Sequence, residues 1–427
     1  MYLKKISFLF LTVLLFLACS QEPPPPTESV NFSENNGGLT LPDGFQASVV
    51  ADSIGYARHV TVDDDGDIYV VLREPQNGNG IAALRDQDND GMAEQIEYFS
   101  EFTDTGIQLH NGYLYVSTTT SIHRYKLNEN ELVPSSEPET VISGFPKQNS
   151  HAAKSFTFDE SGNIYVNVGA PSNACQQESR TKGSPGMDPC PQLERQAGIW
   201  KFSATTLNQT QQDDGQRYAT GIRNAVALDW NSTTDNLYVV QHGRDQLNTL
   251  WPDHFNAEEN AALPAEEFFL VNEGNNFGWP YAYYDWMKEQ KMVMPEYGGD
   301  GETPAEEGKY ENPIMAFPGH WAPNDLIFYT NSHFPEKYLN GAFIAFHGSW
   351  NRAPEPQEGY NVVFVPFEGE TPSGDYEKFA TGFPGTDNPQ PSSAEYRPTG
   401  LAQGPDGSLY ITDSQKGKIW RVLYTGE

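Results

Sequence analysis

The chain is poor in positive charge. It has 26 Lys and Arg against 58 Asp and Glu in 427 residues, which gives a formal net charge of −32 at pH 7. A surface this acidic repels phosphate backbones, so the composition argues against a nucleic-acid partner. Most of the excess acidity is interpreted as a contribution to solubility.

Long apolar runs are also lacking, because only one stretch near the N-terminus is apolar over more than ten residues, and it is too short to span a bilayer. This stretch, Ile6 to Ala18, follows Lys4 and Lys5 and ends at Cys19. A short apolar run that ends in a small residue and a Cys resembles the signal of bacterial lipoproteins, whose Cys is lipidated and becomes the first residue of the mature protein. An ordinary signal peptide with an incidental Cys is the alternative.

The order of these segments predicts three parts. Residues 1–18 are predicted to be a lipoprotein signal peptide, 19–38 a Pro-rich, disordered tether, and 39–427 the folded domain. The predicted location is the bacterial cell envelope, with the protein held by lipid alone at the outer membrane or elsewhere on the periplasmic side.

Cysteine is scarce, with three residues in the chain. Cys19 is assigned to the lipid, and Cys175 and Cys190 lie in one loop rich in Pro, Gly and Ser. Export to an oxidising compartment predicts a disulfide between these two. A metal site is disfavoured because two Cys without a nearby His pair do not complete a tetrahedral shell. Cys-x-x-Cys-His is absent as well, so no c-type haem domain is fused to the chain.

Glycine, proline and aromatic residues are plentiful, with Gly 38, Pro 31, Tyr 22 and Phe 24. One phrase recurs, an apolar run followed by an Asp- and Gly-containing turn and then by Leu or Ile, Tyr and Val. Four close copies and two looser ones are found at 59–70, 155–166, 225–239, 400–411, 107–116 and 338–344. Each copy reads as a β-hairpin with a polar turn. Several copies precede a third strand candidate, at 121–127, 198–202, 360–367 and 418–422.

Six copies at this spacing predict an all-β fold, a six-bladed β-propeller over residues 39–427. An open sheet of so many strands would leave exposed edges. A ring of seven or eight blades with degenerate copies is the competing count.

Antiparallel strands place two kinds of loop on one face of such a propeller, the loop before the first hairpin strand and the loop after the second. In this chain these positions hold Arg58-His59, His151 with Lys154, Arg223-Asn224, Arg397, Arg73-Glu74, 169–173, 241–245, 347–352 and Asp413. A cationic face on an acidic protein suits an anionic ligand bound by guanidinium forks. The alternative is that each Arg pairs with a neighbouring carboxylate and fixes a loop.

Several of these loops carry recognisable motifs. They are Gly221-Ile-Arg-Asn224, His242-Gly-Arg-Asp245, Asn276-Phe-Gly-Trp-Pro280, His347-Gly-Ser-Trp-Asn-Arg352 and Tyr396-Arg-Pro398. In this order they resemble the soluble quinoprotein glucose/sorbosone dehydrogenase family, in its sorbosone- and pyranose-dehydrogenase-like branch. The resemblance covers roughly Thr40 to the C-terminus. It implies a six-bladed propeller that binds pyrroloquinoline quinone and Ca²⁺ on the axial face and oxidises a sugar by hydride transfer to the quinone.

The same resemblance implies roles for residues around the quinone. His151 would be the general base that takes the hydroxyl proton. Arg223 would stabilise the developing negative charge and, with Asn224, lie beside the quinone oxygens. The backbone carbonyls of Gly243 and Arg244 would hold Ca²⁺.

Three further residues are expected at the cofactor. Arg397 would bind a cofactor carboxylate, Arg352 is a candidate for the same role or for a quinone oxygen, and Trp350 would stack on cofactor or substrate. One departure stands out, because the glucose dehydrogenase branch orients its catalytic His with an Asp that follows Gly. The matching pair here is Gly169-Ala170. The partner of His151 must therefore come from elsewhere or be absent.

A separate acidic motif contains Asp86, Asp88 and Asp90 before Gly91, with Glu94 following. Carboxylates at alternate positions before a Gly turn resemble an EF-hand-type calcium loop. Glu97 falls at the position of that loop's last ligand. The motif predicts a second Ca²⁺ site, and an ordinary Asp- and Gly-rich turn is the alternative.

Three functions compete on these grounds. The favoured one is a quinone-dependent sugar dehydrogenase, anchored near a membrane electron acceptor. A Ca²⁺-dependent lactonase would need axial carboxylates around the metal, which this Arg- and His-rich ring does not offer. The third is a non-catalytic propeller that binds a glycan or another partner, because fold alone does not define activity.

Overall fold

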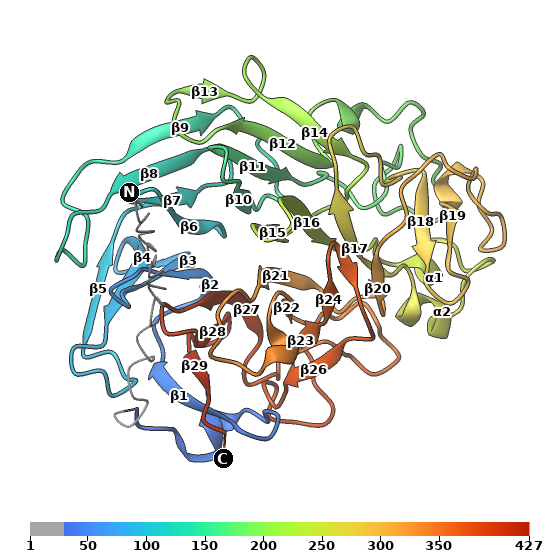
Figure 1. Cartoon of the computed structure of the whole chain (residues 1–427). Coiled ribbons are helices and arrows are strands. Elements are labelled where there is room, and N and C mark those ends of the chain that lie inside the picture. The colour runs from blue at the N-terminus through green and yellow to red at the C-terminus, as the bar shows by residue number, and fades with distance from the viewer. Residues whose placement is uncertain (1–29, 427) are drawn as a thin grey trace, which may run out of the picture.

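Six antiparallel sheets are arranged radially around one axis in the computed structural model, which describes residues 30–426 (Figure 1). Both the all-β class and the count of six blades predicted from the repeats are confirmed. The chain runs from one blade to the next in order, and each sheet starts with the strand nearest the axis.

The blades contain the following strands. Blade one consists of β2 (Ala57–Val62), β3 (Ile68–Gln76), β4 (Asn79–Arg85) and β5 (Gln95–Phe99). Blade two consists of β6 (Ile107–His110), β7 (Tyr113–Ser117), β8 (Ile122–Lys126) and β9 (Glu139–Ser143), with β13 (Gln209–Thr210) added in parallel. Blade three consists of β10 (Phe156–Phe158), β11 (Asn163–Val168), β12 (Gly198–Ser203) and β14 (Gln216–Thr220).

The second half of the ring continues in the same way. Blade four consists of β15 (Ala227–Asn231), β16 (Asn236–Gln241), β17 (Glu266–Val271) and β20 (Met315–Phe317). Blade five consists of β21 (Pro323–Phe328), β22 (Ala342–Phe346), β23 (Asn361–Val365) and β26 (Glu377–Ala380), with a small outer hairpin of β24 (Phe367–Glu368) and β25 (Thr371–Pro372). Blade six consists of β27 (Pro398–Gln403), β28 (Leu409–Asp413) and β29 (Ile419–Tyr424).

The ring is closed by β1 (Phe45–Ala51), the first strand of the chain. It pairs antiparallel with the last strand, β29, from Phe45 opposite Tyr424 to Ala51 opposite Ile419. Blade six is therefore built from both ends of the domain. This closure leaves the sheets without a long unpaired edge and ties the first blade to the last.

The recurring Asp of the repeats fixes the hairpin turns. Asp63 accepts hydrogen bonds from the backbone N–H groups of Asp65 and Asp67, and Asp159 does the same for the turn before β11. An Asp side chain that bonds to the backbone in this way stabilises a tight turn. The looser copy at 338–344 differs, because Tyr338 lies in a short 3-10 helix, Glu336–Tyr338, and the first hairpin strand is β21.

A channel of about 270 Å³ runs along the axis and is lined by the innermost strands of all six blades. Asp325 is buried there, and Asp229 is half-buried. Asp229 accepts the backbone N–H of Phe328 from the next blade, and Asp325 accepts that of Leu401. These carboxylates join neighbouring blades at the axis.

An inserted layer covers part of one face of the propeller. It contains α1 (Leu247–Leu250), α2 (Ala257–Ala262), the hairpin of β18 (Ala282–Asp285) and β19 (Gln290–Val293), the 3-10 helices Pro191–Glu194 and Pro295–Tyr297, and the loop that follows β11. These pieces share a small apolar core around Trp279 and Tyr283. The predicted disulfide between Cys175 and Cys190 is present and buried in this core.

The predicted tether is partly ordered. Residues 34–38 form a 3-10 segment, and the side chains of Ser33 and Asn36 accept hydrogen bonds from β1 at Val49 and Ala47. The prediction of a disordered tether through residue 38 is therefore wrong for this part, because polar side chains there pair with the open side of β1. The signal peptide, Cys19 and the tether up to residue 29 lie outside the described residues. Between residues 30 and 426, no helix is both long and apolar enough to cross a membrane.

Candidate axial active site

The loops singled out by topology do meet at the axis. The ring nitrogen Nε2 of His59 lies 2.7 Å from the Asn324 carbonyl, and that of His242 lies 2.6 Å from the Pro323 carbonyl. Arg397 donates from Nε to the His347 carbonyl at 3.0 Å. Loops from blades one, four, five and six are thus joined in one polar layer.

His151 is held by a backbone carbonyl. Its Nδ1 lies 2.6 Å from the oxygen of Ala170, and because a carbonyl can only accept, Nδ1 carries the proton and Nε2 is free to accept one. Burial, followed by the nearby Arg223 cation, lowers the pKa of His151 to about 3. The Asp that the resemblance leads one to expect is therefore replaced by the Ala170 carbonyl, which fixes the tautomer a general base needs.

Gln148, which the sequence did not single out, and Gly169 hold this loop in place. Gln148 donates from its amide to the carbonyls of His151 at 2.8 Å and of Gly169 at 3.0 Å. A Cβ on Gly169 would lie 2.7 Å from the His151 Cβ and 2.6 Å from Oδ1 of Asn224. Only glycine fits between these side chains, so the Gly before Ala170 sets the approach of His151 to Asn224.

Arg223 is enclosed by oxygen atoms and is only 3% exposed. Nε donates to the Asn173 carbonyl at 3.1 Å, and Nη1 to the carbonyls of Gly243 at 2.7 Å and His242 at 3.5 Å. Nη2 donates to Asn173 Oδ1 at 2.9 Å and to Asp245 Oδ2 at 3.1 Å. A guanidinium has five N–H donors, so all of them are satisfied within the protein. Its contacts give Arg223 an organising role and leave no donor directed at a ligand.

Asp245 is the anion of this arrangement, which the sequence analysis did not assign to the site. Its carboxylate also binds Arg180 Nη2 at 2.8 Å and Asn351 Nδ2 at 2.8 Å. Despite burial, the cations of Arg223 and Arg180 hold the pKa of Asp245 well below its ordinary range. Asp245 therefore stays ionised and joins the loops of blades three, four and five.

A second group of cations lies across the axis and is poorly neutralised. Nε of Arg58 is buried and has no hydrogen-bond partner among residues 30–426. Burial lowers the pKa of Arg58, Asp104 opposes this change and Arg73 adds to it. Burial also lowers the pKa of Arg397 to about 10, and both Arg58 and Arg73 act in the same direction. Burying a guanidinium without a full set of partners costs free energy, unless a bound anion supplies the missing partner.

Two predicted ligand residues of the blade-five loop are placed differently. Trp350 is 55% exposed, so its ring is open to a ligand. Arg352 is directed away from the axis, where Nη1 donates to the carbonyls of Ala261 and Gly319 and Nη2 lies 3.3 Å from Glu358. These contacts contradict a role for Arg352 as a cofactor ligand. They correspond instead to the alternative in which the arginine fixes a loop, because the guanidinium binds the carbonyl of Ala261 in α2 and the carbonyl of Gly319.

The proposed metal segment is built around a buried carboxylate. Glu266 accepts the backbone N–H of Gly243 at 2.7 Å and of Ala322 at 3.1 Å, and burial raises its pKa to about 7. The Arg244 side chain leaves the site and forms an ion pair with Glu296 at 2.7 Å, with both side chains 0% exposed. The carbonyl of Arg244 accepts no hydrogen bond from the part of the chain that the structure describes.

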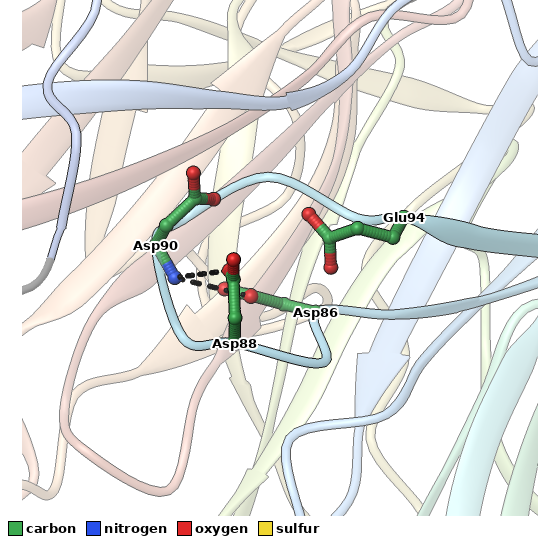
Figure 2. Close-up of side chains that lie close together, drawn as sticks. All are labelled: Asp86, Asp88, Asp90 and Glu94. Atoms are coloured by element: carbon green, nitrogen blue, oxygen red, sulfur yellow. Dashed lines mark hydrogen bonds between the residues drawn. The ribbon is translucent and has the colours of Figure 1, made fainter.

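The acidic motif lies on a separate loop between β4 and β5 (Figure 2). Oxygen atoms of Asp86, Asp88, Asp90 and Glu94 lie within 4.8 Å of one another. The structure thus brings the three predicted residues together and adds Glu94. Glu97 lies within β5 and takes no part, because its carboxylate accepts a hydrogen bond from Gln95. Whether this loop binds Ca²⁺ stays a prediction.

The fold and the site together define a six-bladed propeller whose axial loops carry a neutral histidine beside a group of cations. The chain belongs to the TrAA12-like family, which matches residues 39–425. Over 401 residues it is 26% identical to an uncharacterised protein of Borreliella burgdorferi, with 90% of this chain and 91% of that protein covered. It is 24% identical to a pyrroloquinoline quinone-dependent pyranose dehydrogenase of Coprinopsis cinerea over 230 residues, which cover 47% of this chain and 30% of that relative.

Solved structures share the fold at low sequence identity. The holo pyranose dehydrogenase PQQ domain of Coprinopsis cinerea superposes with a TM-score of 0.70 at 18% identity, covering 94% of this chain and 98% of that domain. A calcium structure of a family AA12 enzyme from Trichoderma reesei gives 0.74 at 18% identity, covering 92% and 98%. At this identity the likeness establishes the propeller architecture.

Proposed function

We propose that the protein is a pyrroloquinoline quinone-dependent dehydrogenase that oxidises a sugar. The observation that carries this proposal is the pairing of an unprotonated His151 Nε2 with the buried Nε of Arg58, which has no hydrogen-bond partner among residues 30–426. Family membership and the names of the relatives support the same conclusion.

The axial cations suit the proposed cofactor. Pyrroloquinoline quinone has three carboxylates, and when bound it supplies an ortho-quinone that accepts hydride. The orphaned Nε of Arg58 is the donor that such an anion would satisfy, with Arg397 and Arg73 beside it. Arg58 therefore replaces Arg352 among the residues expected to bind cofactor carboxylates.

His151 would act on the substrate hydroxyl. With its proton on Nδ1 and the Ala170 carbonyl behind it, Nε2 can accept the hydroxyl proton as hydride leaves the same carbon. The carbonyl stabilises the imidazolium less than a carboxylate would, so we expect a weaker base than in the glucose dehydrogenase branch. Trp350 is the exposed ring against which a sugar or the cofactor could stack.

Calcium would be held by the carbonyls of Gly243 and Arg244, as the resemblance implies. The Arg244 oxygen is free to bind a metal, and the Gly243 oxygen keeps one lone pair beside its bond from Arg223. Because the Arg223 guanidinium lies so close, we expect metal to bind well only together with the anionic cofactor.

The anchor is part of the proposal. A lipid on Cys19 would keep the domain at the cell envelope, where a membrane electron carrier could reoxidise the cofactor.

A Ca²⁺-dependent lactonase is disfavoured, because the axial Asp245 is occupied by Arg180, Arg223 and Asn351. A propeller that only binds a glycan or another partner would not explain why Nε of Arg58 is buried without a hydrogen-bond partner among residues 30–426.

The test uses the protein without its signal peptide, from residue 20. Pyrroloquinoline quinone is added with and without Ca²⁺, binding is followed by calorimetry, and dye reduction is measured with a panel of aldoses. We expect cofactor binding that Ca²⁺ strengthens, and activity that His151→Gln abolishes. A folded protein that does not bind the cofactor would refute the proposal.

A further inference from the structure

A groove that the axial site does not use follows the outer side of the inserted layer. One part, of about 380 Å³, is lined by Tyr281, Tyr297 and Tyr310, and the adjoining part, of about 330 Å³, lies along β19. Ala305, Glu306 and Tyr310 line both parts. The two hollows therefore adjoin each other at the segment from Ala305 to Tyr310 and are together called the groove. Pockets for small organic ligands have similar volumes.

The lining indicates a neutral ligand. Each lysine of the groove already has a carboxylate partner: Lys288 binds Glu302 at 2.9 Å, Lys291 binds Glu267, and Lys309 lies 3.6 Å from Glu306. No cation is thus left over for an anionic ligand within the described groove. What remains are aromatic rings, carboxylate oxygens and the side-chain amides of Gln290 and Asn312.

Rings and carboxylates together match the chemistry of a pyranose. Its C–H face packs on an aromatic ring, and its hydroxyls donate to carboxylate and amide oxygens. Tyr281 and Tyr297 pack edge to face at 4.7 Å, whereas Tyr310 stacks on no other ring between residues 30 and 426. Tyr310 rests on Gly278, where a Cβ would lie 3.2 Å from the ring. The Lys309 ammonium lies 5.6 Å from the centre of this ring, so a sugar that packs on Tyr310 would lie beside Lys309.

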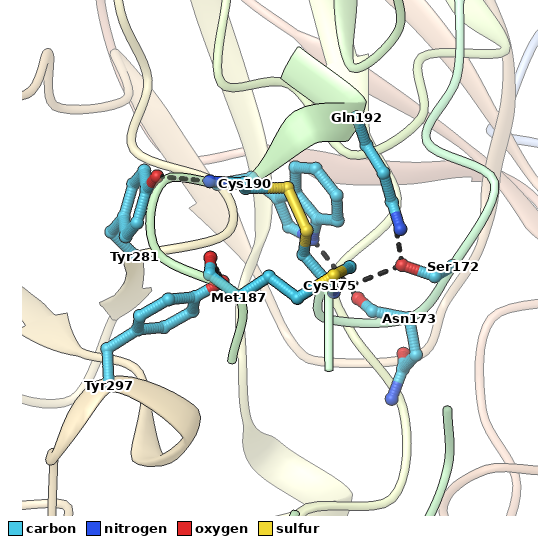
Figure 3. The surroundings of a disulfide bond; sticks show 9 residues. Ser172, Asn173, Cys175, Met187, Cys190, Gln192, Tyr281 and Tyr297 are labelled. Atoms are coloured by element: carbon cyan, nitrogen blue, oxygen red, sulfur yellow. Dashed lines mark hydrogen bonds between the residues drawn. A yellow bond between two sulfur atoms is a disulfide. The ribbon is translucent and has the colours of Figure 1, made fainter. Parts of the chain in front are cut away.

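The groove shares its walls with the axial site. Glu296 lines the groove, and its carboxylate forms the buried ion pair with Arg244 of the axial loop. The hydroxyl of Tyr281 accepts the backbone N–H of Cys190, and that of Tyr297 donates to the Met187 carbonyl, so both rings hold the disulfide loop (Figure 3). That loop begins with Ala170 and Asn173, which position His151 and Arg223.

We propose that this groove is a binding site for a neutral oligosaccharide, with Tyr310 stacking on one pyranose ring and Glu306 accepting hydroxyl hydrogen bonds. Two adjoining hollows of about 380 and 330 Å³ give room for more than one sugar unit. In a step that rests on the proposed function, the groove retains a chain whose end is oxidised at the axial site. The substrate class is then an oligosaccharide or polysaccharide in preference to a free monosaccharide.

Binding is tested without cofactor, by titrating cellohexaose or xylohexaose into the protein that starts at residue 20. We expect at least one hexasaccharide to bind, and Tyr310→Ala to raise its Kd about tenfold. Glu306→Gln, at an exposed position, should weaken binding without affecting folding. Tyr56→Ala is the matched control, because Tyr56 is an exposed tyrosine of blade one outside the groove. The proposal is overturned if neither hexasaccharide binds, or if Tyr310→Ala and Tyr56→Ala bind alike.

Kinetics separate this inference from the proposed function. With cofactor and Ca²⁺ present, Tyr310→Ala should lower kcat/KM for the hexasaccharide that binds and leave that for glucose unchanged. Oxidation of glucose together with an unaltered hexasaccharide KM in Tyr310→Ala would refute the groove and keep the dehydrogenase. Hexasaccharide binding that depends on Tyr310 in a protein that oxidises no sugar would support the groove and refute the dehydrogenase.

Discussion

Replacing Arg58 by Gln should have opposite effects on stability and on cofactor binding. Nε of Arg58 has no partner within residues 30–426, and the nearby cations of Arg73 and Arg397 repel it. Asp104 offsets only part of the cost of burying this charge, so its removal relieves desolvation and repulsion. We therefore expect Arg58→Gln without cofactor to be at least as stable as the wild type, with a free energy of unfolding higher by about 1 kcal/mol.

Cofactor binding should change in the other direction. A hydrogen bond between a guanidinium and a carboxylate contributes about 1.5–3 kcal/mol, so its loss should weaken binding about 10- to 100-fold. Urea unfolding gives the stability, and calorimetric titration with pyrroloquinoline quinone gives the affinity. The cofactor affinity of Arg58→Lys, which keeps the charge but loses the planar guanidinium, should lie between those of the wild type and Arg58→Gln.

Arg352→Gln is the matched control, since it removes an arginine from the same face of the propeller. Its guanidinium binds the carbonyls of Ala261 and Gly319, so the variant should lose about 1–3 kcal/mol of stability and keep cofactor affinity. The reasoning is refuted if Arg58→Gln is destabilised like Arg352→Gln and binds the cofactor as tightly as the wild type.

Four further outcomes are expected. Arg223→Gln should cost about 3–5 kcal/mol of unfolding free energy in denaturant, because the variant leaves the carbonyls of His242 and Gly243 without a donor and removes one of the two arginines that bind Asp245, and a smaller loss would contradict the enclosed geometry. His151→Gln should lower kcat about 10²- to 10⁴-fold with cofactor affinity unchanged, and a proportional loss of affinity would count against its role as base. Burial raises the pKa of Asp229 to about 7, so between pH 4 and pH 7 the folded state binds a proton that the unfolded state has released. Stability, followed as Tm, should therefore fall as the pH rises through this range. Asp229→Asn should make this fall smaller, by about 1 kcal/mol of unfolding free energy per pH unit. Ca²⁺ added without cofactor should raise Tm in the wild type but not in Asp88→Asn. Asp387→Asn, which changes an exposed aspartate outside the acidic loop, is the control and should keep the rise in Tm, and an equal rise in all three would exclude the acidic loop as the site.

The sequence predicted the axial histidine but not its support. The departure at Ala170 removes a carboxylate side chain, and the backbone of that same residue supplies the acceptor instead. Every residue has a backbone carbonyl, so no pattern of side chains in the sequence predicts this contact. Gln148 was missed for a similar reason, since its bonds are to backbone oxygens of another loop.

The arginines show the same limit. The sequence placed Arg58, Arg223 and Arg352 in axial loops, and two alternatives stayed open for each of them. Which applies depends on acceptors 50 or more residues away, such as Asn173 for Arg223 and Ala261 for Arg352. The acidic loop was more predictable, because its ligands are close in sequence, although the structure selects Glu94 in place of Glu97.

The sequence alone determined the propeller architecture and the face on which the axial loops meet. Most hairpins are encoded locally by strand periodicity and a polar turn, which Asp63 and Asp159 cap in two of them, and antiparallel pairing then requires the neighbouring loops to lie on one face. What only the tertiary structure decided is which charges are neutralised, because that depends on long-range contacts between blades. Arg223 is enclosed by five oxygen atoms, while Nε of Arg58 is left without a partner among residues 30–426, and the proposed binding of an anionic cofactor depends on this difference.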